Sequence, residues 1–446
     1  MQVRHTLWVF VAAALLAACD SPLETNPTAQ IPADDALRTG ADIRLAVRGI
    51  YDALQEDELY NRDLVAYPEL YADNLRFTGT FTTDGQVGNR NISPTNSAIH
   101  DAWLRMYEVI SRANYVLDAI PEAEAIEEEE SDQYEGEALF LRALAHFNAV
   151  RYWGDVPLVL EPVRVVTGES QLSRTAAGDV YAQIEADLAK AVDLLEGFSA
   201  QGRATSGAAQ ALLARVYLEQ GKWAQAVSAA TAVIDEYGYE LEASYADIFA
   251  TKNSDEAIFE LQYSINDDNS LAFWFFPQAL GGRRGFAPTD ALYDAYEPGD
   301  VRRDVSIAIH DNDGEELLFA TKYHRIANGD DNVPVIRLAE MYLIRAEANA
   351  RLGTSPAVVR GDIDVIRNRA GLPDLPTSIT AEEDLISAVL QERRLEFAFE
   401  GHRFFDLRRT GRAEDVLGIP ASRLLFPIPQ QEIDVNENLR QNAGYN

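Results

Sequence analysis

Helical periodicity that recurs in pairs is the sequence feature that most restricts how this chain can fold. The clearest pair is a helix over residues 207–219 followed, after a short break, by a helix over 222–237. Small and apolar residues recur along both helices at the intervals typical of tetratricopeptide repeats, in which two antiparallel helices pack closely. These residues are Leu213, Ala214, Tyr217, Ala226, Ala230 and Val233. The repeat usually has a bulky residue where Ala230 stands, so the match is incomplete.

Three further pairs show the same periodicity. The expected partners are 335–352 with 355–370, 41–58 with 97–120, and 134–153 with 176–196. Several helix pairs in one chain predict a mainly α fold, an α–α superhelix of tetratricopeptide-like pairs. Residues 61–96 and about 238–334 lack sustained periodicity and are rich in Gly, Asn, Asp, Thr and aromatic residues. We expect this irregular, loop-rich half to carry binding groups on the helical support.

The N-terminus indicates export and lipid attachment. The apolar run 7–16 has the length of a signal-peptide core and is too short to span a bilayer. Small residues separate it from Cys19, the single cysteine, in the form of a bacterial lipobox. We therefore expect a signal peptide over 1–18, a lipid anchor at Cys19 within a flexible tether over 19–33, and a single domain over 34–446. An ordinary secretory signal beside a chance cysteine is the alternative.

The charge balance excludes several classes of partner and site. The chain has 38 Lys+Arg against 72 Asp+Glu, a formal net charge of -34, which excludes nucleic acid as a natural partner. Anionic lipid is equally unattractive, so a membrane link would depend on the acyl group and on protein contacts. Acylation of Cys19 would leave no thiol for disulfides, metal binding or catalysis. The acid-rich, lysine-poor composition suits high salt, although a GC-rich genome would also deplete lysine.

Motifs in the second half of the chain and around residue 140 carry the most specific signal. They are 136–147 (GEALFLRALAHF), 151–158 (RYWGDVPL), 296–303 (YEPGDVRR), 367–373 (RNRAGLP), 391–409 (QERRLEFAFEGHRFFDLRR), 426–433 (FPIPQQEI) and 438–445 (NLRQNAGY). Taken in this order, they resemble the SusD/RagB family of outer-membrane nutrient-binding lipoproteins.

The resemblance implies an architecture, a location and a function. It implies one domain with an N-terminal family region over about 34–240 and a C-terminal region over about 241–446. It places the protein on the extracellular side of the outer membrane of a Bacteroidetes-type bacterium, held by Cys19. There it would pair with a TonB-dependent, SusC-like β-barrel transporter and act as a lid that captures oligosaccharides, or in some members peptides. The family has no catalytic step, so we expect no catalytic residues, cofactor or metal.

The charged residues of the 391–409 motif are expected to be structural. Their signs alternate around phenylalanines, which suits a partly buried salt-bridge network that locks a helix corner at Gly401. They are Glu392, Arg393, Arg394, Glu396, Glu400, Arg403, Asp406, Arg408 and Arg409. Glu137 and Arg142 are expected to serve likewise.

Ligand contacts should come from the irregular segments. Sugars present apolar faces and dense hydroxyls, so they need aromatic platforms beside polar and charged groups. Two clusters, within 67–91 and 266–284, meet this need. The candidate residues are Asp73, Asn74, Arg76, Phe77, Trp274 and Arg283. For any single aromatic residue here, packing under a long loop is an equally good interpretation.

An enzyme and a scaffold protein are the two alternatives to a binding protein. The histidines show no metal-ligand spacing, and phosphate loops and nucleophile elbows are absent from the sequence. The stretch 311–314 (DNDG) departs from a calcium-loop pattern and predicts a turn, and 127–130 (EEEE) predicts a solvated loop. A glycoside hydrolase would need a cleft that sequence cannot show. A helical-repeat scaffold without a small ligand remains the main alternative.

Overall fold

The computed structural model describes residues 36–165, 167–168 and 171–445. The predicted signal peptide, the Cys19 anchor and the tether lie outside these residues. The fold is mainly helical, as predicted. Its larger helices are α3 (Gly40–Ala53), α6 (Ser97–Ala119), α7 (Glu128–Trp153), α8 (Ala177–Leu194), α9 (Ser206–Glu219), α10 (Trp223–Glu236), α15 (Leu338–Arg351), α16 (Pro356–Arg369) and α17 (Glu382–Glu396).

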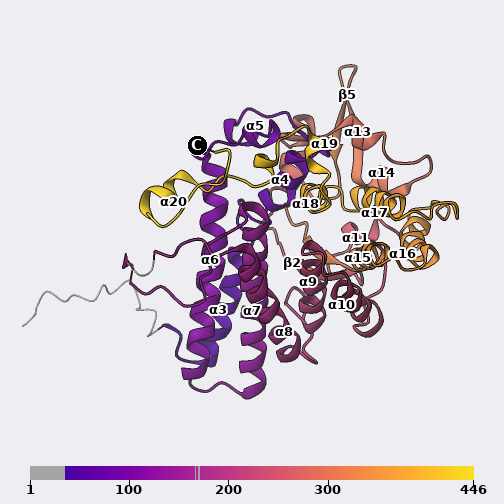
Figure 1. Cartoon of the computed structure of the whole chain (residues 1–446). Helices are drawn as coiled ribbons and strands as arrows, with labels where there is room; N and C mark the ends of the chain where they lie inside the picture. The colour runs from indigo at the N-terminus through magenta and orange to yellow at the C-terminus, as the bar shows by residue number, and fades with distance from the viewer. Residues whose placement is uncertain (1–35, 166, 169–170, 446) are drawn as a thin grey trace, which may run out of the picture.

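These helices pack on one another in chain order and form one array. Each of the four predicted pairs is present: α9 packs on α10, α15 on α16, α3 on α6 and α7 on α8. The chain leaves the array after α10 and returns at α15, which packs directly against α10. Figure 1 shows α3, α6 and α7 at one end of the array and α15, α16 and α17 at the other. The interruption of the sequence pattern therefore does not interrupt the array in space.

Three predicted helix boundaries were wrong: the helix expected over 41–58 ends at Ala53, and the other two have identifiable reasons. The helix expected from residue 335 begins at Leu338, because Val333–Arg337 forms strand β6 against β2. The acidic run 127–130 was expected to be a loop, but α7 begins at Glu128 and three glutamates occupy its first turn. Negative side chains in the first turn are stabilised by the unpaired amides and the dipole of a helix N-terminus. The run is therefore a helix start.

The irregular half contains short helices and three two-stranded antiparallel sheets. The sheets pair β1 with β3, β2 with β6 and β4 with β5. The strands are β1 (Leu75–Phe77), β2 (Ala257–Leu261), β3 (Phe286–Pro288), β4 (Ile307–Asn312), β5 (Glu315–Ala320) and β6 (Val333–Arg337). The short helices of this half are α4 (Asp63–Tyr71), α5 (Thr82–Gly88), α11 (Asp247–Ala250), α12 (Leu271–Phe275), α13 (Asp290–Tyr293) and α14 (Val301–Ser306). Three more short helices follow α17: α18 (Arg403–Arg409), α19 (Ala413–Leu417) and α20 (Gln430–Val435).

Helix α4 explains why residues 61–96 gave no helical signal. Every residue of α4 is buried. A helix that is covered on all sides has no polar face, and so its sequence lacks the amphipathic period that reveals surface helices.

One hydrophobic cluster joins the helical array to the irregular half. It extends along the chain from Ile43 to Leu439, and a smaller cluster lies among α15, α16 and α17. The segment around Pro427 closes the core, because the indole nitrogen of Trp153 donates a hydrogen bond to the Pro427 carbonyl at 3.0 Å. Across the part of the chain that the structure describes, no helix has both the length and the apolar character needed to cross a bilayer.

Candidate ligand-binding surface

Pairing of β1 with β3 brings the two predicted ligand clusters together. Phe77 lies opposite Phe286, and the pairing continues beyond the strands, where the Thr78 amide donates to the Gly285 carbonyl at 2.9 Å. Residues 77–81 and 273–286, about 200 positions apart in the chain, thereby form one surface. The amide of Arg283 also donates to the Phe273 carbonyl at 2.6 Å, which closes the second segment on itself.

Four side chains form what we call the aromatic surface: Phe81, Phe273, Trp274 and Arg283. Phe81 is 45% exposed and Phe273 is 43% exposed, whereas Trp274 is only 8% exposed. The Trp274 ring lies 5.9 Å from the Phe81 ring, 5.8 Å from the Phe273 ring and, stacked, 5.6 Å from Phe286. Trp274 therefore supports two exposed phenylalanine rings from below.

Guanidinium groups border these rings. The Arg283 guanidinium lies 4.3 Å from the Phe81 ring centre and 5.3 Å from that of Trp274, and Arg62 lies 4.8 Å from Trp274. Cation–π contacts of this kind stabilise the arrangement by roughly 0.5–1 kcal/mol each at exposed sites. Arg283 has no carboxylate partner among the described residues, while Arg62 is paired with Asp63 at 2.6 Å. Arg283 therefore keeps donors available to a ligand.

Arg76 and Phe77, on strand β1, have different surroundings. Arg76 is exposed and has no hydrogen-bond or ion-pair partner among the described residues. Burial lowers the pKa of the neighbouring Arg284, and the positive charge of Arg76 lowers it further. Phe77 is half-buried, with its ring 6.4 Å from Phe286, so packing beneath the loops accounts for it.

Asn74 was predicted to contact ligand, and the structure argues against this. Its side chain is fully buried; its amide donates to Glu69 at 2.6 Å and its carbonyl accepts from Arg394 at 2.9 Å. A side chain with no exposed surface and both polar ends satisfied cannot reach a sugar. The sequence places Asn74 in a plausible cluster, but only the tertiary structure shows that α4 and α17 enclose it.

Asp73 is likewise engaged within the protein. Its carboxylate accepts from Arg403 at 2.7 Å and lies 3.1 Å from Arg394. Burial opposes ionisation of Asp73, but the hydrogen bond and charge of Arg403, with the charge of Arg394, outweigh burial and hold its pKa below the ordinary value. Asp73 therefore anchors the start of the loop that leads to β1.

The charges of the 391–409 motif lie in a buried salt-bridge network, as predicted, but most of their partners lie outside the motif. Arg337 contacts Glu256 and Glu400, both at 2.8 Å, and also pairs with Glu396. Burial opposes ionisation of Glu396, but the charges of Arg369, Arg337 and Arg302 outweigh it and hold its pKa well below the ordinary value. At Gly401 the chain turns from α17 towards α18, so Arg394 and Arg403 reach Asp73 from both sides of the corner. The corner thus holds the start of the segment that leads through β1 to the aromatic surface.

Phe81 and Phe273 are the exposed rings of this surface, and neither was among the candidate residues, although Phe273 lies within the predicted 266–284 cluster. Phe81 is a lone aromatic residue in a stretch otherwise made of Thr and Gly, 78–83 (TGTFTT). Such a residue has no apolar neighbours in sequence to pack against, and this was the available signal. Phe273 and Trp274 are adjacent, and sequence alone does not show which of the two faces solvent.

Chemically, the surface offers apolar platforms beside hydrogen-bond donors. Phenyl rings can stack on the C–H faces of sugars, and a guanidinium can donate several hydrogen bonds to hydroxyl or carboxylate oxygens. Among the described residues, no group of three or more His, Cys, Asp or Glu side chains is placed to hold a metal ion. The arrangement suits binding of a polar, ring-containing ligand.

Two family models match this chain. Residues 34–218 match the family described as "Starch-binding associating with outer membrane", and residues 318–422 match the SusD family. The first match covers the helices from α3 to α9, and the second includes the 391–409 motif. Both matches agree with the resemblance inferred from the motifs.

Curated relatives match over nearly the whole chain. The chain is 27% identical to SusD-like protein P38 of Formosa agariphila, over 99% of each chain. It is 30% identical to the starch-binding protein SusD of Bacteroides thetaiotaomicron, but over only 40% of this chain and 31% of that protein.

Solved structures share the fold. A laminarin-binding SusD-like protein superposes with a TM-score of 0.80 at 28% identity, covering 92% of this chain and 100% of that one. A SusD superfamily protein from Bacteroides vulgatus has a TM-score of 0.82 at 24% identity, covering 91% and 99%. The helix pairs, the motifs, the two family models and these full-length similarities together show that the chain belongs to the SusD-like family.

Proposed function

We propose that the protein captures oligosaccharides at the aromatic surface and binds them without a catalytic step. The observation that carries the proposal is the pair of exposed rings, Phe81 and Phe273, on a buried Trp274. The Arg283 guanidinium lies beside them; its one side-chain hydrogen bond among the described residues goes to the Thr80 hydroxyl at 3.4 Å, which leaves further donors for a ligand. The names of two similar proteins, one starch-binding and one laminarin-binding, support a glycan as ligand. Peptides are the second ligand class that the resemblance allows.

Phe81→Ala tests this proposal at the exposed platform. Loss of one stacked ring should weaken glycan binding by roughly 10- to 100-fold, because burying an aromatic side chain contributes about 1.5–3 kcal/mol. Arg283→Ala should weaken it by about tenfold through lost hydrogen bonds. Leu104→Ala removes a similarly exposed apolar side chain on α6 and should leave glycan affinity unchanged. Affinities would be measured by titration calorimetry with glycans that an array selects.

Other results would favour other functions. If neither glycan arrays nor peptide panels gave saturable binding, capture of a small ligand would be wrong and a scaffold would be favoured. Release of shortened sugars by the purified protein would instead point to a hydrolase.

We further propose that the chain comprises a signal peptide over 1–18, a lipidated Cys19 with a tether over 19–33, and one domain over 34–446. The hydrophobic cluster from Ile43 to Leu439 supports a single domain. The protein would lie at the outer-membrane surface and pass its ligand to a TonB-dependent, SusC-like β-barrel. The family description "associating with outer membrane" supports that location. Co-purification with a large β-barrel in mild detergent tests the partnership.

Cys19→Ser should separate anchoring from binding. Without the thiol there is no acyl chain, and we expect most of the protein to move from the membrane to the soluble fraction. Glycan affinity should stay within about twofold, because the proposed anchor and tether precede the domain that carries the aromatic surface. Fractionation and calorimetry check the two effects, and a variant that stays in the membrane would contradict the anchor.

A further inference from the structure

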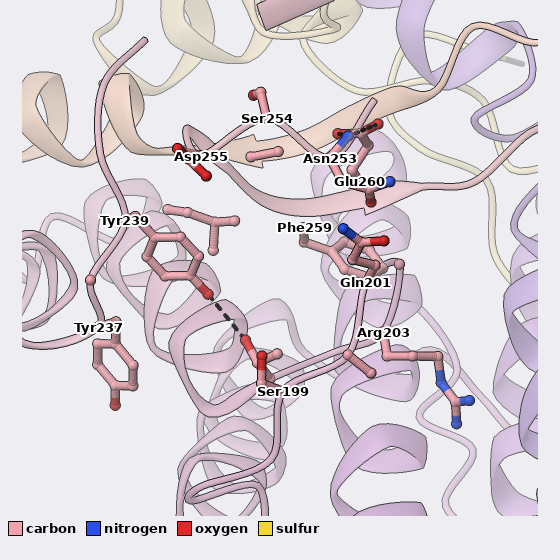
Figure 2. Close-up of a pocket in the computed structure, with 16 residues that line it drawn as sticks. Ser199, Gln201, Arg203, Tyr237, Tyr239, Asn253, Ser254, Asp255, Phe259 and Glu260 are labelled. Carbon is pink, nitrogen blue, oxygen red and sulfur yellow. Dashed lines mark hydrogen bonds between the residues drawn. The ribbon is translucent and has the colours of Figure 1, made fainter. Parts of the chain in front are cut away.

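A groove beside the β2–β6 sheet shares no lining residue with the aromatic surface. It consists of two adjoining hollows of about 280 and 610 Å³, which is the scale of small-molecule sites, roughly 300–1,000 Å³. We call the two hollows together the tyrosine groove. The residues that line both hollows are Ser199, Thr205, Tyr237 and Tyr239. Figure 2 shows the first hollow, with β2 and the turn before it on one side and the α8–α9 connection on the other.

The two tyrosines are fixed in place by the start of α9. The Tyr239 hydroxyl lies 3.1 Å from the Thr205 hydroxyl, and the Tyr237 hydroxyl lies 3.2 Å from that of Ser206. Gly207 makes this packing possible, because a Cβ there would lie 2.7 Å from the Tyr239 hydroxyl oxygen and 3.0 Å from the Tyr237 ring. Both rings are half-buried. They are therefore held in position before any ligand arrives, which lowers the entropic cost of binding.

Polar groups without intramolecular partners line the first hollow. The Gln201 amide and the Asp255 carboxylate are exposed and make no hydrogen bond within the described chain. The hydroxyl of Ser254 is buried and has no partner among the described residues. Together these groups supply both donors and acceptors, the combination that sugar hydroxyls require.

The charges of the groove restrict what it can bind. Its one cationic lining residue, Arg203, is committed to Glu137, with a contact of 2.7 Å. Asp255 and Glu260 lie in the first hollow, and burial raises the pKa of Glu260 to about 7. The second hollow adds the acidic residues Asp193, Glu196 and Glu236. A polyanionic ligand would meet like charge with no free guanidinium to offset it.

We propose that the tyrosine groove is a second carbohydrate subsite, for a neutral oligosaccharide that stacks on Tyr237 and Tyr239 and hydrogen-bonds to Gln201 and Asp255. This inference rests on the proposed function, since it assumes that the protein binds glycans. A chain of sugars can extend across the tyrosine pair, because that pair lines both hollows. Two separated subsites would let one protein hold a long glycan at two points, which raises its avidity.

Titration calorimetry with maltohexaose and laminarihexaose tests the inference. The proteins are the wild type, Phe81→Ala, Tyr239→Ala and the double variant Gln201→Ala/Asp255→Ala. The double variant changes only exposed side chains without partners, so we expect it to fold normally, and thermal unfolding verifies this. We expect two sites in the wild type. The double variant should weaken one of them by about tenfold, since about two hydrogen bonds are lost. Phe81→Ala should weaken the other.

Each outcome separates the two proposals. One site that is lost in Phe81→Ala and unchanged in both groove variants would overturn the second subsite and leave the proposed function standing. One site that is lost only in the groove variants would support the groove and overturn the aromatic surface as the binding site. No saturable binding to the wild type would overturn both.

Discussion

Replacing Arg337 with methionine is expected to lower the free energy of unfolding by about 3–5 kcal/mol, because it removes a counter-charge that three buried carboxylates share. The Arg337 side chain is 2% exposed and contacts Glu256, Glu396 and Glu400, each of them also almost fully buried. Methionine fills a similar volume, so the loss would reflect charge more than packing. Urea-induced unfolding followed by circular dichroism measures it.

Arg105→Met is the matched control for this prediction. Arg105 also faces several carboxylates, Glu56, Glu58 and Glu108, but its side chain is 38% exposed. Exposed pairs contribute about 0–1 kcal/mol because water and salt screen them. Equal losses in the two variants would contradict the view that the buried network determines stability.

The pH dependence gives a second readout for Arg337→Met. The pKa of Glu396 is depressed in the folded state, so its ionised form contributes stability above the ordinary value of 4.5, and this stability is lost as pH falls below it. Protonated carboxyls need no counter-charge. The difference in free energy of unfolding between the wild type and Arg337→Met should therefore shrink as pH falls below 4.5. If that difference stayed constant, lost packing would be responsible.

Gly401→Ala is expected to lower the free energy of unfolding by about 2–5 kcal/mol. Gly401 has a φ of +81°, in the left-handed region, where an L side chain costs about 1–2 kcal/mol. An added Cβ would also lie 2.3 Å from the backbone oxygen of Leu64 at the start of α4. Backbone cannot move aside as a flexible side chain can, so overpacking adds about 1–3 kcal/mol.

Gly411→Ala separates the two causes. Gly411 has a φ of +70°, but no atom lies within 4 Å of an added Cβ. Gly411→Ala should therefore lower the free energy of unfolding only by the conformational cost, about 1–2 kcal/mol. If both variants lost the same amount, close approach to α4 would be irrelevant.

The same pair of variants tests whether the 391–409 motif positions the aromatic surface. The corner at Gly401 lies between Arg394 and Arg403, which hold Asp73 and so the approach to β1. We expect Gly401→Ala to weaken glycan binding at temperatures where it is still folded, while Gly411→Ala leaves binding unchanged. Calorimetry on both variants well below their unfolding temperatures checks this expectation.

The helical array could be predicted because its signal is local. Small residues such as Ala214, Ala226 and Ala230 recur at helical spacing and are all fully buried between α9 and its neighbours. The structural role of the 391–409 charges could be predicted as well, because clustered opposite charges in an apolar segment must pair when they are buried.

The residues of the candidate surface could be predicted only by region. Asn74 and Phe81 both lie in a polar, irregular stretch, yet one is fully buried and the other is 45% exposed. The difference depends on which distant segment covers each residue. Arg394 of α17 reaches Asn74, whereas Phe81 contacts Trp274 and remains partly exposed to solvent. Spacing along the chain carries no record of such contacts.

The sequence by itself determined the mainly helical fold, the family and the structural role of the 391–409 charges, since periodicity and motif order are properties of the chain. The tertiary structure alone decided that α15 packs on α10 across the long interruption, and that two loops about 200 residues apart form one surface. It also decided that Tyr237 and Tyr239 border a separate groove. The exposure of a side chain and the meeting of distant segments both depend on long-range packing, and so neither can be determined before the chain is folded.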